Sequence, residues 1–467
     1  MKKAYTKGSY KCYEHDFRKH IKSSSRVRSY SILKHQRRTG AILDTKKITK
    51  QISNKTIKYF EKMGDDSSII VTGEKAIIKI PPNFCFIESP EESLKVIFQA
   101  FQHSNNLDIS HVHLDHSRVK KYSLTAEALL GLGIEITTKK RQIIKRRYRN
   151  LNLNRNCQLR VTGKLPENTD HRKMIEEIGV LKDLKISPPL STTAKRNQLL
   201  FRKKSVGANI ADAYSNDDKT KAAFQFAKHV NRCVNEHQLS LTLEAKNELM
   251  QAVSEVLDNA ERHSSASGNS HIWHARGYLN SNSENEYLEI SLFNFGMTIA
   301  RTFETLPEDN YGRHQVMGYA DYHKDILDRE LLITIAALQQ RYSSKNISER
   351  DTNGQGTTIL IEFFERFCDE LSKTPIYKTV TPQMSIVSGK THIVFDGTYR
   401  LTNHPNYTNT EDEQLIIAFN ATNSLKSPPD PNYVRQLSGN AYFPGVCISI
   451  KIPLKEENDD GKNSDDH

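Results

Sequence analysis

The sequence of 467 residues has few cysteines, and their spacing matches no common cysteine motif. No two form a C-x-x-C pair, so neither a zinc knuckle nor a disulfide framework is indicated, and we expect a reducing, cytoplasmic setting. The chain also lacks any apolar run approaching the ~20 residues that cross a bilayer. Its basic residues 1–9 are followed by no apolar stretch, so we expect neither a secretory signal nor a membrane segment. The six cysteines are Cys12, Cys85, Cys157, Cys233, Cys368 and Cys447.

Acidic residues are scarce in two stretches. Residues 1–64 contain 18 lysines and arginines but only 4 aspartates and glutamates, and this local charge of +14 exceeds the +12 of the whole chain. Residues 139–160 contain nine basic residues and no acid. Such patches attract polyanions, so nucleic acid is one candidate partner. A solvated basic surface with a flexible arm is the alternative interpretation.

Strands and helices are predicted to alternate between residues 67 and 188. Segments rich in Ile and Val predict strands, and segments with apolar residues three and four positions apart predict helices. This order is typical of an α/β layer. The predicted strands cover residues 68–71, 75–80, 109–114 and 157–161, and the predicted helices cover residues 90–101, 123–134 and 170–184.

This N-terminal half resembles a STAS-like domain in residues 111–119 (HVHLDHSRV) and 160–179 (RVTGKLPENTDHRKMIEEIG). The STAS proteins that regulate sigma factors carry an Asp-Ser pair whose serine is phosphorylated. The corresponding segment here is Lys121-Tyr122-Ser123, without the aspartate. Ser123 is therefore expected to be a helix N-cap rather than a phosphate acceptor.

A longer helix is predicted over residues 242–263, where apolar residues recur at helical spacing. Glu255 and Asn259 are four residues apart, so their side chains project from one face, on a stripe that also holds Arg262. This segment, EVLDNAERH, resembles the N-box of the GHKL family, which includes histidine kinases and type II topoisomerases. The resemblance implies that the Asn259 carboxamide oxygen ligates Mg²⁺ and that Glu255 orients or deprotonates the attacking water. An ordinary amphipathic helix is the alternative.

A strand is predicted over residues 287–296 (YLEISLFNFG), where apolar and polar residues alternate as in a half-buried strand. Its end resembles the D-x-G-x-G box of the same family, in which the aspartate accepts a hydrogen bond from the adenine amino group. Asn294 replaces that aspartate, Gly296 keeps the first glycine, and Thr298 replaces the second. Asparagine still offers a carbonyl acceptor but loses the charge of a carboxylate, a difference of ~1 kcal/mol or more.

Two glycines precede an apolar helical run in residues 351–367 (DTNGQGTTILIEFFERF). A glycine-rich loop that opens a helix offers free N–H groups to phosphates. This segment resembles the family's second glycine box, which implies that Gly354, Gly356 and Thr357 contact the nucleotide. Residues 312–353, with one predicted helix over 328–340, resemble the mobile ATP lid, and Lys345 is placed to reach the terminal phosphate.

These observations predict an α/β protein of two units. A basic arm (1–66) precedes a STAS-like α/β domain (67–188), a linker (189–218) and an ATP-binding domain with the GHKL-type α/β sandwich and its mixed sheet (219–455). Residues 456–467, acidic and rich in Gly, Asn and Ser, are predicted to be a disordered tail.

The sequence leaves three functional hypotheses. The resemblance implies an ATP-binding regulatory protein that uses Mg²⁺, either an ATPase switch acting on a protein or nucleic-acid partner or a serine/threonine kinase similar to the anti-sigma kinases. A non-catalytic nucleotide-binding module is the third, because Asn294 departs from the family pattern. A homodimer is among the assemblies that the resemblance allows.

Overall fold

The computed structural model describes residues 55–64, 70–147, 158–186, 200–204, 216–237, 239–263, 272–280, 286–340, 342–344, 346, 356–373, 381–403 and 414–454. Most of the basic arm, part of the second basic stretch and the acidic tail lie outside these residues. Within them, no helix combines the length and the apolar character needed to cross a membrane.

The N-terminal half contains the alternating strands and helices that the sequence predicts. Its four-stranded sheet has the order β1-β2-β4-β6, in which β2, β4 and β6 pair in parallel and β1 is antiparallel to β2. A short pair, β3 (Asn83–Phe84) and β5 (Lys121–Tyr122), lies beside it. The sheet strands are β1 (Ile70–Thr72), β2 (Lys75–Lys79), β4 (His111–Asp115) and β6 (Arg160–Lys164). The helices are α4 (Lys55–Phe60), α5 (Pro90–Asn105), α6 (Leu124–Arg147), α7 (Thr169–Glu177) and α8 (Val180–Asp183).

Ser123 precedes α6 and caps it. Its Oγ accepts hydrogen bonds from the backbone N–H groups of Phe86 at 2.8 Å and Ala126 at 3.4 Å, and the residue is 1% exposed. The bond from Ala126 satisfies an amide in the first turn of α6 that has no acceptor within the helix. The N-cap interpretation is therefore confirmed, and the Ser123 hydroxyl is not accessible to a kinase in this conformation.

The second basic stretch is partly internal, which limits the surface it offers to a polyanion. Arg141 is 1% exposed and donates hydrogen bonds to the carbonyl oxygens of Ser104 and Ile109, at 2.7 and 2.8 Å, next to the end of α5. Lys140 is also buried, and burial lowers the pKa of its amine to about 8. These two side chains hold α6 against α5 and do not form a surface patch.

The C-terminal half is built on a seven-stranded sheet of order β14-β11-β10-β15-β9-β8-β7. The α/β class is confirmed, but the mixed sheet predicted for this half is wrong, because every described strand pair in it is antiparallel. Among the described residues, parallel pairing occurs in the N-terminal half. β7 lies within the predicted linker, so part of that segment belongs to the sheet. The strands are β7 (Leu200–Lys204), β8 (Trp273–Asn280), β9 (Tyr287–Phe295), β10 (Gln383–Gly389), β11 (Thr391–Phe395), β14 (Val434–Gln436) and β15 (Phe443–Pro453).

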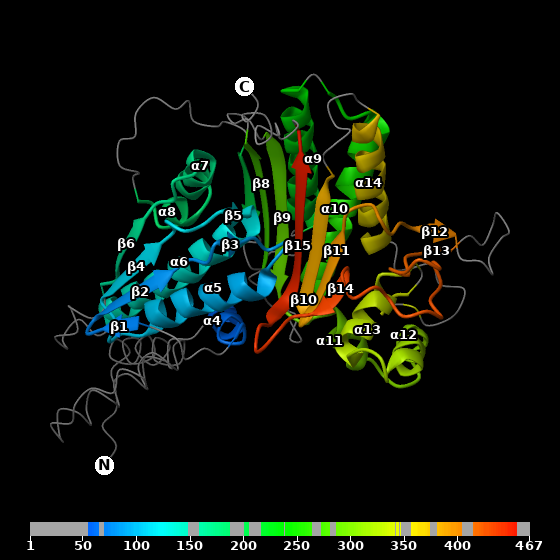
Figure 1. Ribbon diagram of the computed structural model, residues 1–467, viewed down its shortest axis with the longest axis horizontal. Helices are drawn as coiled ribbons and strands as arrows, with labels where there is room; N and C mark the ends of the chain where they lie inside the picture. The colour runs from blue at the N-terminus through cyan, green and yellow to red at the C-terminus, as the bar shows by residue number, and fades with distance from the viewer. Residues whose placement is uncertain are drawn as a thin grey trace, which may run out of the picture.

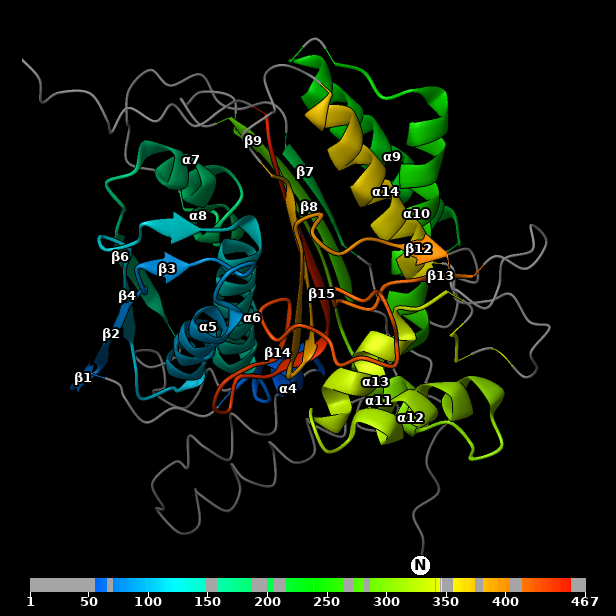
Figure 2. The same ribbon diagram turned by 45° about the vertical axis from the view of Figure 1, so that its right-hand side comes forward.

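Helices cover both faces of this sheet, as Figures 1 and 2 show. On one face lie α9 (Asn216–Asn235), α10 (Leu243–His263) and α14 (Gly356–Ser372), and at one end lie α11 (Ile299–Glu304), α12 (Tyr311–His323) and α13 (Arg329–Ala337). The other face packs against the N-terminal half, mainly through α6. A small pair, β12 (Thr402–Asn403) and β13 (Leu415–Ile416), lies beside α14.

The side chains of β9 divide between the two faces. Leu288, Ile290 and Leu292 join the apolar cluster of α9, α10 and α14, whereas Phe293 and Phe295 join the core of the N-terminal half. The expectation of a half-buried strand is therefore wrong, because all nine residues of β9 are buried. The period-two pattern instead separates an apolar face from a more polar, equally covered face.

Polar contacts tie α6 to the sheet. The Glu289 carboxylate on β9 accepts a hydrogen bond from the backbone N–H of Leu124, the first residue of α6. The Thr125 hydroxyl lies 2.8 Å from Ser291 Oγ and 2.7 Å from Ser449 Oγ. Because these groups are buried, their hydrogen bonds fix the position of α6 on the sheet.

Candidate functional site

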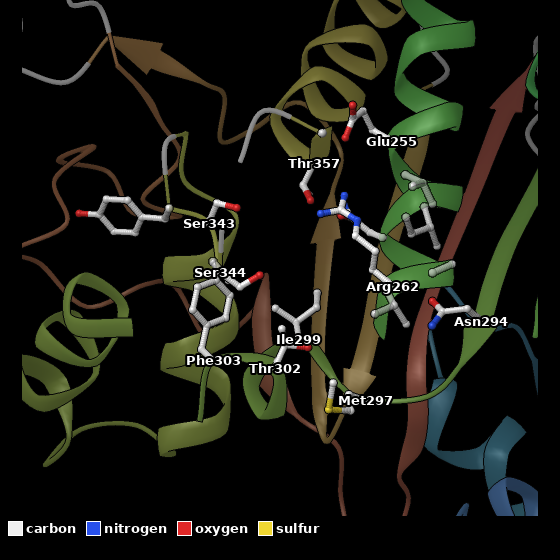
Figure 3. Close-up of a pocket in the computed structure, with 18 of the residues that line it drawn as sticks. Glu255, Arg262, Asn294, Met297, Ile299, Thr302, Phe303, Ser343, Ser344 and Thr357 are labelled. Carbon is white, nitrogen blue, oxygen red and sulfur yellow. The ribbon is translucent and has the colours of Figure 1, made fainter. Parts of the chain in front are cut away.

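A cavity of about 380 Å³ lies between α10, the end of β9, α11, the segment 342–344 and the first turn of α14 (Figure 3). It brings together five residues that the sequence predicts for a nucleotide site: Glu255, Asn259, Asn294, Gly356 and Thr357. These residues come from three separate stretches of the chain.

Three other predicted residues are not in this lining. Gly296 follows the end of β9 and its N–H donates to the carbonyl of Pro444 at 3.0 Å, but it does not line the cavity. Its place in a nucleotide site therefore stays a prediction from the resemblance. Lys345 and Gly354 lie outside the described residues.

α10 supplies the polar wall of the cavity. Leu249, Val253 and Leu257 face the core, so Glu255 and Asn259 turn to the cavity from the opposite side of the helix. Arg262, one turn further along, also lines the cavity and donates from Nη2 to Asn259 Oδ1 at 2.8 Å. The oxygen predicted as a Mg²⁺ ligand thus accepts a hydrogen bond from a cation in this structure.

Arg262 was absent from the predicted site, although it lies on the same helical stripe. Its i+3 position relative to Asn259 was the available signal, because side chains three apart are neighbours on a helix. Figure 3 shows its guanidinium reaching toward Thr357 across the cavity. A positive charge therefore lies between α10 and the start of α14, the two elements predicted to lie near the phosphates.

α14 begins at Gly356, directly against Glu255. A Cβ at Gly356 would lie 2.8 Å from Glu255 Cβ and 3.2 Å from its Oε2, so only glycine lets the two helices approach this closely. The prediction that a glycine opens this apolar helix is confirmed. The first N–H groups of the helix have no intrahelical acceptor, and its positive dipole end lies at the cavity.

Asn294 closes the far end of the cavity from β9. Its backbone pairs with Val446 on one side and Trp273 on the other, and the residue is 6% exposed. Its carboxamide makes no hydrogen bond with another described residue, and neither of its polar atoms is among the buried ones that lack a partner, so the amide opens on the cavity. The remaining lining here is apolar: Val256, Met297, Ile299, Val446 and Ile448.

Gly445 makes the approach of β15 to Asn294 geometrically feasible. Its φ is +144°, and a Cβ there would lie 2.0 Å from the Asn294 carbonyl oxygen. A larger residue would displace β15 or the end of β9. The backbone that carries Asn294 is therefore fixed from both neighbouring strands.

Ser343 and Ser344 form the opposite wall, with Tyr342 beside them (Figure 3). The segment rests on the start of α12, where a Cβ at Gly312 would lie 2.0 Å from the Ser343 carbonyl oxygen. The sequence predicted one helix in residues 312–353, which is wrong, because α12 and α13 both lie there. The two glycines of α12 weaken its helical signal, although Asn310 caps it through Arg313 N–H at 2.9 Å.

A second hollow of about 580 Å³ lies between the end of α9, the start of α10 and the end of α14. It is larger than the first and is lined by charged side chains, of which Arg366 pairs with Glu248 at 2.7 Å. No residue of the predicted site lines it. The first cavity is therefore the better candidate, despite its smaller volume.

The side chains that line the first cavity offer few ligands for a metal ion. Among the described residues, no group of three or more His, Cys, Asp or Glu side chains is arranged to hold a metal ion. A metal at Asn259 would therefore need ligands from a bound molecule, as Mg²⁺ takes from phosphates. No match to this chain was found among protein-family models, curated proteins or solved structures.

Proposed function

We propose that this cavity binds a nucleoside triphosphate with Mg²⁺ and that the C-terminal half is a GHKL-type ATPase domain. One observation carries the proposal. Glu255 and Asn259, one turn apart on α10, lie beside the glycine-opened start of α14, in a cavity that ends at the buried amide of Asn294.

The phosphates would lie at the first turn of α14. The free N–H groups, the Thr357 hydroxyl and the Arg262 guanidinium are all donors, and the helix dipole adds a positive potential. The base would lie against the apolar lining near Asn294. A cavity of about 380 Å³ is within the ~300–1,000 Å³ typical of small-ligand sites.

Asn259 offers one neutral oxygen ligand, which suits Mg²⁺ held mainly by phosphates. When bound, Mg²⁺ would neutralise phosphate charge. Arg262 would have to release Asn259 Oδ1 for this, and the phosphate charge gives its guanidinium a stronger acceptor.

Glu255 is the candidate general base for hydrolysis. It lines the cavity at the α14 side, where the terminal phosphate would lie, and it is the only carboxylate in the described lining. Its role would be to hold a water against that phosphate and accept its proton.

The proposed activity is that of an ATP-dependent switch. β9 carries Asn294 toward the cavity and Ser291 and Glu289 toward α6. A shift of this strand on nucleotide binding would therefore act directly on the contacts with the proposed STAS-like half. A kinase acting on Ser123 of the same chain is less favoured, because that hydroxyl is buried and engaged.

Calorimetry of Mg-ATP with the full chain tests the proposal. We expect binding by the parent, and its loss in Asn259→Ala. Asn247→Ala is the matched control, because Asn247 is exposed on the same helix and does not line the cavity. No binding by the parent at millimolar ATP, or equal binding by Asn259→Ala, would contradict the assignment.

Phosphate release then tests Glu255. Glu255→Gln should retain binding but lose turnover by about 100-fold or more. Glu244→Gln, exposed on α10 and outside this cavity, should behave as the parent.

A further inference from the structure

The buried amide of Asn294 is a two-sided polar group in an otherwise apolar corner. It is 6% exposed, lines the cavity and makes no hydrogen bond with another described residue. Because this amide faces the cavity, a ligand that displaces solvent from this corner must replace the hydrogen bonds that solvent makes with the amide.

An amide offers a donor and an acceptor side by side, and rotation about its last torsion exchanges them. The six-membered ring of adenine presents a 6-amino donor next to a ring nitrogen acceptor. The corresponding edge of a 6-oxo purine, such as guanine or hypoxanthine, presents an acceptor next to a ring N–H donor. One asparagine can pair with either edge, whereas a carboxylate accepts only and opposes the 6-oxo group.

Neither charged side chain of the described lining is placed to discriminate between bases at this corner, because the Arg262 guanidinium reaches toward Thr357 and Glu255 lies further away (Figure 3). The only carboxylate, Glu255, lies on α10 at the α14 side, away from Asn294 on β9 (Figure 3). The neighbouring side chains Met297, Ile299 and Val446 have no hydrogen-bond donor. The Asn294 amide is thus the polar group available to read the substituent at position 6.

We propose that this site does not discriminate between 6-amino and 6-oxo purine triphosphates, so that GTP and ITP are ligands alongside ATP. This inference rests on the proposed nucleotide function and on the base lying at Asn294. It assigns Asn294 as the residue that sets base specificity, and it attributes the breadth of specificity to the amide.

The test is calorimetry of the full chain with Mg²⁺ and, in turn, ATP, GTP, ITP and CTP. We expect the three purine triphosphates to bind within about tenfold of one another and CTP more weakly. Asn294→Asp should keep ATP and weaken GTP and ITP by about tenfold or more, because two acceptors then face each other. Asn247→Asp, exposed on α10, makes the same change of charge outside the cavity and should leave the ratios unchanged.

The outcomes separate the two proposals. ATP binding that exceeds GTP and ITP by much more than tenfold in the parent would overturn the inference and leave the nucleotide site intact. Equal binding of CTP would overturn the restriction to purines, because cytosine offers the amide the same amino and ring-nitrogen edge as adenine and differs in its smaller ring. No binding of any triphosphate would overturn the proposed function itself. The parent's own ligand series decides the inference even where Asn294→Asp does not fold.

Discussion

The two faces of the seven-stranded sheet are used in opposite ways. Toward α6, the sheet carries Glu289 and Ser291, whose side chains hydrogen-bond to the first residues of that helix. Toward α10, the same strand ends at Asn294, whose amide opens on a cavity. One face is closed by protein contacts and the other leaves a polar group for a ligand.

This difference indicates how each face tolerates change. On the closed face, a buried charge depends on one specific partner, so removing that partner affects folding. On the open face, the polar residues line a solvent-connected cavity and hold little of the structure together. Variants of the buried polar residues on the closed face should therefore change stability, and variants of the cavity residues on the open face should change binding.

The largest effect is expected from Asp183→Ala on the closed face. Asp183 lies on α8 and pairs with Arg276 of β8 at 3.2 Å, and both side chains are fully buried. The second partner of Asp183, Arg202 of β7, is 33% exposed, so the loss of this pairing should cost less. The variant leaves the Arg276 guanidinium with the Ile178 carbonyl, at 2.7 Å, as its main remaining acceptor. We expect the free energy of unfolding to fall by about 3–5 kcal/mol, measured by urea denaturation of the full chain.

Its control is the double variant Asp183→Ala with Arg276→Met. An apolar side chain needs no counter-charge, so the double variant should recover most of the loss. A single variant within about 1 kcal/mol of the parent would show that the closed face does not depend on this ion pair.

An intermediate effect is expected from pH, again on the closed face. His274 stacks on Phe293 with ring centroids 4.8 Å apart, and burial, then the nearby Arg276, Lys204 and Arg202, hold its pKa well below 6.5. Because the folded pKa is lowered, both states are neutral above pH 6.5. Below that, only the unfolded chain binds the proton, so stability falls by up to about 1.4 kcal/mol per pH unit.

His274→Phe keeps the stack and removes the titrating group. Its stability should fall less steeply than that of the parent between about pH 6.5 and 5, measured by urea denaturation at each pH. Some slope should remain, because burial also lowers the pKa of His171 despite the opposing influence of Glu127. Equal slopes in parent and variant would contradict the assignment to His274.

Local patterns explain why much of the cavity was predictable. The helical stripe of Glu255 and Asn259, the alternation that ends at Asn294, and the glycine that opens α14 are each encoded within a few residues. Their convergence was predicted from the resemblance to the GHKL family, whose boxes occur in the same order. The α/β order of the N-terminal half was likewise visible from periodicity alone.

Long-range packing explains what the sequence did not show. The alternation along β9 predicts that Glu289 and Ser291 face solvent, but they are 2% and 0% exposed. They are covered by α6, whose residues Leu124 and Thr125 hydrogen-bond to them from 165 and 166 positions away in the sequence. No periodicity within β9 distinguishes a covered polar face from an open one. The joined cores of the two halves were hidden for the same reason.

The smallest effect on stability is expected from Arg262→Gln on the open face. The Arg262 side chain is 32% exposed and lies 3.8 Å from Asp258, so its loss should change the unfolding free energy of the unliganded chain by less than about 0.5 kcal/mol. The same variant should weaken triphosphate binding. A contact between a guanidinium and a phosphate is worth about 1.5–3 kcal/mol, more than the ~1 kcal/mol recovered by freeing the neutral Asn259 amide.

The net loss of about 1 kcal/mol corresponds to a rise in Kd of roughly five- to tenfold, which thermal unfolding with and without Mg-ATP would measure as a smaller ligand-induced shift. Arg366→Gln is the control, because Arg366 is also an exposed arginine paired with an acid, at 2.7 Å from Glu248, but lies outside the cavity. A loss of stability above about 1 kcal/mol without ligand would mean that the open face is also structural. An unchanged shift would mean that Arg262 does not reach the phosphates. In either case, variants on the two faces of the sheet would differ less in their effects on stability and binding than their side chains indicate.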